Sequence, residues 1–195
     1  IMRSGDVIPK HIATLRYDKN ICEELMDDMI ICHSCGESLV WDETYTELVC
    51  KNPNCREKVI SKMVYGFATL GCKEFSEPTV IKLYEAGYTD ILHLLNFTAN
   101  VLKTIDGIGE ALAKTMADQF YNIIFDGVPF SVLITALNYF EGKLGVKICQ
   151  KVIDDLSREE LDDIRQFLTL ERCCKVEGVD VITAKVLVDG INRFL

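Results

Sequence analysis

The sequence contains no apolar run of about 18 residues, so we expect no transmembrane helix and no membrane partner. Its first fifteen residues lack an apolar signal core and carry Asp6, Pro9 and Lys10, which favours a cytoplasmic protein. Only 4 prolines and 12 glycines occur among 195 residues, which excludes collagen-like and low-complexity sequence. Because 49% of the residues are hydrophobic, the chain is long and apolar enough for one or two domains with buried cores.

Positive charge is also scarce, since the formal net charge is -9. Non-specific nucleic-acid binding depends mainly on Lys and Arg neutralising phosphates, so the negative net charge argues against general electrostatic binding to nucleic acid. The charge is uneven along the chain: residues 17–49 are strongly acidic, whereas residues 1–16 and 50–63 are net basic. Such local patches still allow one DNA-binding face on an acidic body. The basic residues of the second patch are Lys51, Arg56, Lys58 and Lys62.

Cysteine, in contrast, is abundant, with nine residues in a chain read as intracellular. Four of them form the pattern C-x2-C-x14-C-x4-C, and each pair lies in a polar sequence typical of turns. Four thiolates at this spacing predict a structural Zn²⁺ site without an open position for catalysis. A His33 ligand and four free buried cysteines are the alternatives. The predicted ligands are Cys32, Cys35, Cys50 and Cys55; the other cysteines are expected to be buried small side chains.

The hydrophobic periodicity changes at residue 56. The opening residues are β-like, residues 17–30 form an acidic connector, and strand-like sequence separates the two cysteine pairs. From residue 56 the pattern is helical, and Ser157 followed by Glu160 indicates a capping box. We therefore predict a mainly α fold, a bundle of helical hairpins preceded by a small β-rich zinc module. The expected helices span 56–68, 78–86, 90–96, 98–105, 109–125, 129–138, 145–155, 157–169 and 180–194.

A glycine-containing turn joins two of these helices. In Ile105-Asp106-Gly107-Ile108-Gly109, glycines allow close approach to a DNA backbone, and amides at the next helix start favour an anion. This design predicts a phosphate clamp that needs little positive charge; a plain helical turn with a C-capping glycine is the alternative. Poorer versions of the turn occur at Gly71, Gly145 and Gly178, and in the last of them Asp180 replaces the second glycine.

Three features in this order, GDVIPK, the four-cysteine pattern and the hairpins, resemble the C-terminal region of the bacterial-type NAD-dependent DNA ligases. The segment PFSVLITALNYF is also similar to that family. The resemblance implies that residues 1–16 end an oligonucleotide-binding (OB) barrel, that 31–55 are a zinc finger, and that 56–195 are a helix-hairpin-helix DNA-binding domain. The glycine-poor hairpins and the acidic connector indicate a divergent relative, such as a viral or phage protein acting in the host cytoplasm.

The resemblance implies a DNA-binding C-terminal part, or a small subunit, of a ligase that grips nicked double-stranded DNA during replication and repair. NAD and Mg²⁺ would act only through the family's adenylation domain, which is a further expected partner. The Lys-x-Asp-Gly nucleophile motif of that domain is absent, because Lys103 and Lys175 stand in imperfect versions inside hairpins. We therefore predict no catalytic residue. The predicted DNA-binding residues are Gly107, Ile108, Gly109, Gly145, Gly178, Arg3 and Lys10.

Three other functions fit the same sequence. A stand-alone zinc and hairpin protein would bind nicked or branched DNA without a ligase partner. A helix-hairpin-helix DNA glycosylase would need a residue such as Lys114 or Asp118 in a base-flipping pocket after the hairpin. A protein-interaction module with an acidic surface would bind no DNA.

Overall fold

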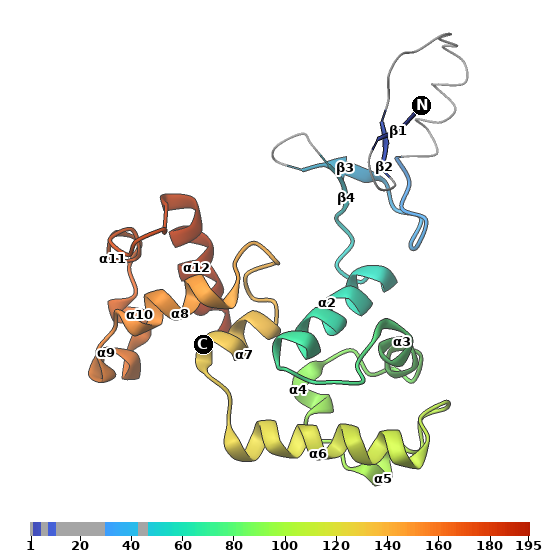
Figure 1. Ribbon diagram of the computed structural model, residues 1–195. Coiled ribbons are helices and arrows are strands. Elements are labelled where there is room, and N and C mark those ends of the chain that lie inside the picture. Colours follow the sequence, from blue (N-terminus) through green and yellow to red (C-terminus); the bar gives the residue numbers. More distant parts are fainter. Residues whose placement is uncertain (1, 5–7, 11–29, 43–46) are drawn as a thin grey trace. The chain divides into compact units, whose positions relative to one another are not determined.

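The computed structural model describes residues 2–4, 8–10, 30–42 and 47–195, and this part of the chain is mainly helical (Figure 1). The predicted acidic connector lies outside these residues except for Ile30. Contacts divide the chain into two compact units, Ile1–Arg56 and Glu57–Leu195. Within the described ranges, no helix combines the length and the apolar character needed to cross a membrane.

In the described residues of the first unit, the regular structure is two short pairs of antiparallel strands. Strands β1 (Met2–Ser4) and β2 (Ile8–Lys10) pair with Arg3 opposite Pro9. Strands β3 (Leu39–Trp41) and β4 (Leu48–Cys50) pair with Leu39 opposite Cys50. The strand-like sequence between the cysteine pairs therefore forms the predicted strands.

The second unit is built from helices joined by short turns. Most of its longer helices begin and end within one or two residues of the predicted bounds, because their apolar residues recur at helical spacing. The helices are α2 (Arg56–Thr69), α3 (Glu77–Glu85), α4 (Ile91–Leu94), α5 (Ala99–Leu102), α6 (Glu110–Asp126), α7 (Phe130–Ala136), α8 (Val146–Asp154), α9 (Arg158–Asp162), α10 (Ile164–Phe167), α11 (Leu170–Cys173) and α12 (Val181–Phe194).

The helices α2 to α6 enclose the first of two hydrophobic cores. Its centre is a group of three rings: the Phe67 centroid lies 4.1 Å from that of Phe75 and 6.0 Å from that of Phe120. Each ring is at most 5% exposed, so each buries most of a large apolar surface. The ring group joins α2, the turn before α3, and α6, so the turn at 70–76 is held against α6.

The helices α7 to α12 enclose the second core, which includes Phe140, Cys149 and Leu187. The two cores meet where Gly66 of α2 approaches α7. A β-carbon at Gly66 would lie 2.6 Å from the Ala136 carbonyl oxygen, so the close helix approach requires glycine there.

One predicted helix, 157–169, is wrong. The capping box between Ser157 and Glu160 is confirmed, with both reciprocal hydrogen bonds present, and it starts α9. The helix then breaks at Asp163, which has non-helical angles (φ −128°, ψ 54°). This break allows Ile164 and Leu168 to enter the second core, so tertiary packing overrides the local helical pattern. The following short helix α11 was not predicted.

Candidate metal centre and hairpin sites

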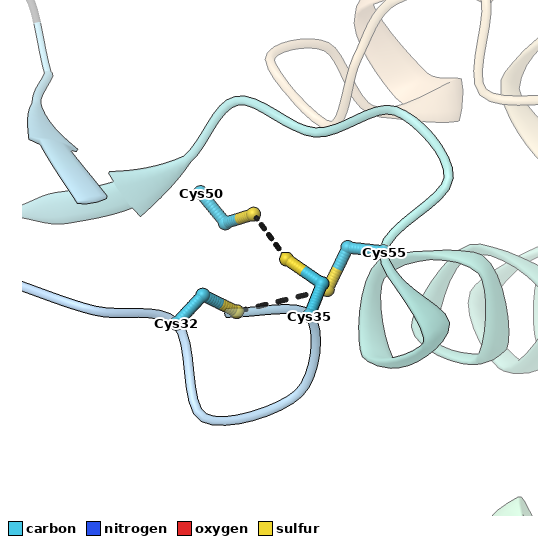
Figure 2. A group of neighbouring side chains, drawn as sticks. All are labelled: Cys32, Cys35, Cys50 and Cys55. Atoms are coloured by element: carbon cyan, nitrogen blue, oxygen red, sulfur yellow. Dashed lines mark hydrogen bonds between the residues drawn. The ribbon is translucent and has the colours of Figure 1, made fainter. Parts of the chain in front are cut away.

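The four predicted metal ligands come from two turns and lie close together (Figure 2). Cys32 and Cys35 stand in the turn before β3, where the Gly36 N–H donates to the Cys32 carbonyl at 2.8 Å. Gly36 has a φ of 73°, a backbone conformation that a glycine adopts without strain. Cys50 ends β4, and Cys55 comes directly before α2. The β3–β4 hairpin therefore brings one pair of thiols to the other.

The sulfur atoms are spaced as a tetrahedral metal site requires. All four lie within 4.8 Å of one another; Cys32 Sγ is 3.8 Å from Cys55 Sγ, and Cys35 Sγ is 3.5 Å from Cys50 Sγ. Zinc–sulfur bonds of about 2.3 Å in a tetrahedron place the sulfur atoms about 3.8 Å apart. The donor set fits Zn²⁺, and the four residues could hold a metal such as zinc. His33 is not part of this group.

The pKa of Cys50 indicates how a bound cation would change the protonation of the four cysteines. The pKa of the Cys50 thiol is raised to about 12: burial is the largest cause, a backbone hydrogen bond at Asn52 opposes it, and the neighbouring Cys35 and Cys32 thiols add to the rise. Four closely spaced thiolates repel one another unless a cation lies between them. A bound metal would hold them deprotonated, because thiolate is the form that coordinates.

The cysteines outside this group have mixed environments. Cys149 and Cys173 are buried in the second core, as predicted. Cys72 is half-buried, and burial raises its pKa to about 11. Cys174, the residue that follows α11, is exposed, so the prediction of burial is wrong for this residue. Cys22 lies outside the described residues.

The predicted clamp forms a tight turn between α5 and α6, which we name the 103–109 hairpin. The Ile105 N–H donates to the Leu102 carbonyl (3.1 Å) and the Ile108 N–H to the Ile105 carbonyl (3.0 Å). Ile105 and Ile108 point into the first core, with 6% and 4% of their surface exposed. Gly109 then caps the start of α6 with extended angles, and no side chain caps that helix. The apolar residues thus fix the turn, and the helix start remains open.

The two glycines of this hairpin have different surroundings. A β-carbon at Gly109 would meet no heavy atom within 4 Å. Gly107 has a φ of 73°, and a β-carbon there would lie 3.0 to 3.3 Å from the last atoms of the Lys82 side chain. The Lys82 ammonium donates to the Gly107 carbonyl at 2.8 Å. The Lys82 side chain of α3 therefore fills the space beside Gly107. The sequence pattern did not indicate this lysine, because residue 82 lies far from the hairpin in the chain.

A second turn, residues 174–180 between α11 and α12, repeats this backbone. Gly178 has a φ of 84°, as Gly107 has 73°, and Asp180 caps α12 where Gly109 caps α6. The Asp180 carboxylate accepts a hydrogen bond from the Thr183 N–H at 2.7 Å, so this helix start carries a negative side chain. The matching hydrogen bonds of the 174–180 hairpin are Cys174 N–H to Leu170, Val176 N–H to Cys173, Val179 N–H to Val176, and Ala184 N–H to Asp180.

The other glycine-containing turns have different backbones. Gly145 caps the start of α8 without a side-chain cap, but the preceding turn is longer and includes positive φ angles at Asn138, Glu141 and Gly142. Arg193 of α12 contacts that turn, because its guanidinium forms an ion pair with the Glu141 carboxylate at 2.7 Å. That contact lowers the pKa of Glu141.

The turn that contains Gly71 is held by a side chain of α6. Gln119 accepts a hydrogen bond from the Lys73 N–H at 2.5 Å and donates to the Lys73 carbonyl at 3.2 Å.

The remaining predicted residues are spread over both units. Arg3 and Lys10 lie in β1 and β2, whose side chains are outside the described part of the chain. Lys103 caps the end of α5, and Lys175 forms an exposed ion pair with Glu171 at 3.2 Å. Neither lysine lies in a setting that would activate a nucleophile.

Comparison with known proteins gives one consistent result. The chain is 28% identical over 193 residues to a DNA ligase of Vesicomyosocius okutanii, which covers 98% of the chain. It is 28% identical over its whole length to a DNA ligase of Acanthamoeba polyphaga mimivirus. A DNA ligase of Nitratiruptor sp. is 28% identical over 86% of the chain. This chain is a divergent relative of the DNA ligases.

The relationship covers only part of each ligase. The chain spans 28% of the length of the first two relatives and 26% of the third. No protein-family model matches the chain.

Proposed function

We propose that this chain is a DNA-gripping part of an NAD-dependent DNA ligase, and that it holds nicked duplex DNA while a separate adenylation domain performs the chemistry. The observation that carries the proposal is the 103–109 hairpin in a relative of the DNA ligases: no side chain caps the helix start at Gly109, and a β-carbon there would meet no heavy atom within 4 Å. Backbone amides at a helix start bind phosphate without reading bases, which suits an enzyme that acts on nicks of any sequence.

Within this proposal, residues 56–195 form a helix-hairpin-helix domain and the 103–109 hairpin is its main phosphate contact. The hairpins at Gly145 and Gly178 are weaker candidates, because one has a longer turn and the other carries the Asp180 carboxylate. Arg3 and Lys10, in the proposed end of an OB barrel, supply basic contacts near the nick, together with the 50–63 patch.

The proposed metal is a structural Zn²⁺ held by Cys32, Cys35, Cys50 and Cys55. The ion would complete the 31–55 zinc finger, because the described part of this segment has little regular structure apart from the two strands β3 and β4. Small domains that lack a large core are commonly stabilised by a metal in this way. With all four positions filled by sulfur, the ion has no site for substrate.

The glycosylase alternative fits less well. It requires Lys114 or Asp118 in a pocket that admits a flipped base, whereas both residues are exposed on α6. A stand-alone DNA-binding protein remains distinguishable from a ligase part by experiment.

The proposal is tested by reconstitution on a nicked duplex. The chain alone, incubated with NAD and Mg²⁺, is expected to form no lysyl-AMP and to seal no nick. Adding an adenylation domain of an NAD-dependent ligase from the same source should raise the sealing rate well above that of the domain alone. Sealing that does not respond to the chain would contradict the ligase assignment. Covalent AMP on the isolated chain would contradict the non-catalytic role.

A further inference from the structure

The sequence of the 103–109 hairpin places unfavourable negative charge beside the proposed phosphate site. Its exposed acidic residues Asp106 and Glu110 flank the open start of α6, against the single cation Lys103. Amides at a helix start attract a phosphate, but two nearby carboxylates oppose it. A phosphate-binding hairpin in this setting needs a cation from elsewhere in the fold.

Lys82 is placed to supply that cation. It lies on α3, and its ammonium donates to the Gly107 carbonyl at 2.8 Å, with its last methylenes across the α-carbon of Gly107. Among the described residues, this is the one hydrogen bond that the Lys82 ammonium makes, and it forms no ion pair there. An ammonium has three donors, so two remain for another acceptor.

The position of Lys82 is fixed by the packing of its helix α3. Its helix α3 follows the turn that Gln119 of α6 clasps through both backbone groups of Lys73. Val80 and Leu83 of the same helix are fully buried in the first core. The helix that carries Lys82 and the helix that begins at Gly109 are therefore held in one packed core.

We propose that Lys82 is the positioning residue of the 103–109 hairpin, which fixes the turn through the Gly107 carbonyl and places a positive charge beside the DNA phosphate that the hairpin binds. This inference rests on the proposed DNA-binding function. It also distinguishes the two equivalent hairpins. In the 103–109 hairpin, the Lys82 side chain from α3 lies beside Gly107. In the 174–180 hairpin, a β-carbon at the equivalent Gly178 would meet nothing within 4 Å.

The test compares Lys82→Met, Lys82→Arg and the matched control Lys151→Met, an exposed lysine of α8. Binding of the whole chain to nicked duplex is measured at several salt concentrations, with melting curves for each variant. Lys82→Met should weaken binding about fivefold at low salt and reduce the slope of log K against log salt by about 0.9, the value for one phosphate contact. Lys82→Arg should restore the slope, and Lys151→Met should leave it unchanged.

Unchanged binding by Lys82→Met, or weaker binding with an unchanged salt slope, would overturn the proposal, since a purely structural role does not alter ion release. If Lys82→Met does not fold, Lys82→Gln, which keeps a hydrogen-bond donor without the charge, is measured against Lys82→Arg in its place. Gly109→Val is measured in parallel. If it also leaves binding unchanged, the hairpin function itself fails; if it alone weakens binding, only the role of Lys82 fails.

Discussion

Gly109 and Asp180 occupy the same position in two hairpins that share one backbone. Each residue caps the helix that follows with extended angles, φ −73° and ψ 164° for Gly109 and φ −86° and ψ 174° for Asp180. Gly109 leaves the start of α6 without a side-chain cap, whereas Asp180 accepts from the Thr183 N–H at 2.7 Å. One hairpin therefore presents open amides, and the other presents a carboxylate.

Gly109→Val should separate DNA binding from stability. The extended backbone accepts a side chain, and a β-carbon there meets nothing within 4 Å, so the melting temperature should change little. The valine would instead occupy the space in front of the α6 amides, and binding to nicked duplex should fall about tenfold or more, equally for all sequences. Fluorescence anisotropy and thermal melting on the same preparation check this.

The matched control is Gly107→Val in the same turn. There φ is 73° and the Lys82 side chain lies across the α-carbon, so this variant should lose on the order of 1–3 kcal/mol of stability. If Gly109→Val unfolds the chain, or leaves both binding and melting unchanged, the phosphate-clamp interpretation is wrong.

Asp180→Gly should turn the 174–180 hairpin into a second phosphate site. The change removes a carboxylate from the start of α12 and exposes its amides, while replacing the cap by glycine costs only a few tenths of a kcal/mol. Binding to nicked duplex should strengthen about threefold to tenfold, by one additional charge-assisted contact. The control is Asp189→Asn, an exposed residue of the same helix. Equal gains in the two variants would show that only the overall charge matters.

Cys50→Ser should release the metal. The freshly purified chain is expected to contain one Zn²⁺ by elemental analysis, and the variant much less than one. Loss of a structural zinc removes binding energy on the order of 10 kcal/mol from folding, so residues 31–55 should become sensitive to protease. Cys174→Ser, which changes an exposed cysteine, should retain full zinc. A metal-free wild-type chain, or full zinc in Cys50→Ser, would refute the four-cysteine site.

The Arg172–Glu160 ion pair predicts acid sensitivity of the second core. The Arg172 guanidinium, 2.5 Å from the Glu160 carboxylate, and the Ser157 capping bond lower the pKa of Glu160 from 4.5 to about 2. The folded pKa lies below the ordinary value, so the pair stabilises the fold fully above pH 4.5. That stabilisation is lost as the pH falls from 4.5 toward 2.

Arg172→Met should therefore lower the melting temperature at pH 6, and the difference from wild type should shrink as the pH approaches 2. Lys175→Met, which breaks an ion pair whose side chains are 72% and 85% exposed, should change the melting temperature little at any pH. A difference that stays constant between pH 6 and pH 2 would assign the Arg172 effect to contacts that do not titrate, such as its hydrogen bond to the Asp155 carbonyl at 2.8 Å.

The sequence by itself determined the elements whose signal is local. The C-x2-C-x14-C-x4-C spacing identifies Cys32 and Cys50 as members of one group, because polar turns place paired cysteines close together and four thiolates can share one tetrahedral metal ion. Helical periodicity sets α6 and α12 nearly to their ends, and Ser157 with Glu160 marks a helix start through its own side chains. The sequence did not predict the helix break at Asp163, because packing in the second core causes that break.

Only the tertiary structure decided what surrounds each hairpin. Gly107 and Gly109 look equivalent in the sequence, yet one glycine faces open space and the other faces Lys82, which a separate helix brings across the core. The equivalence of Gly109 and Asp180 likewise depends on a shared pattern of backbone hydrogen bonds. Charge acts through space and falls off with distance, so the cation beside a site is set by folding and not by position along the chain.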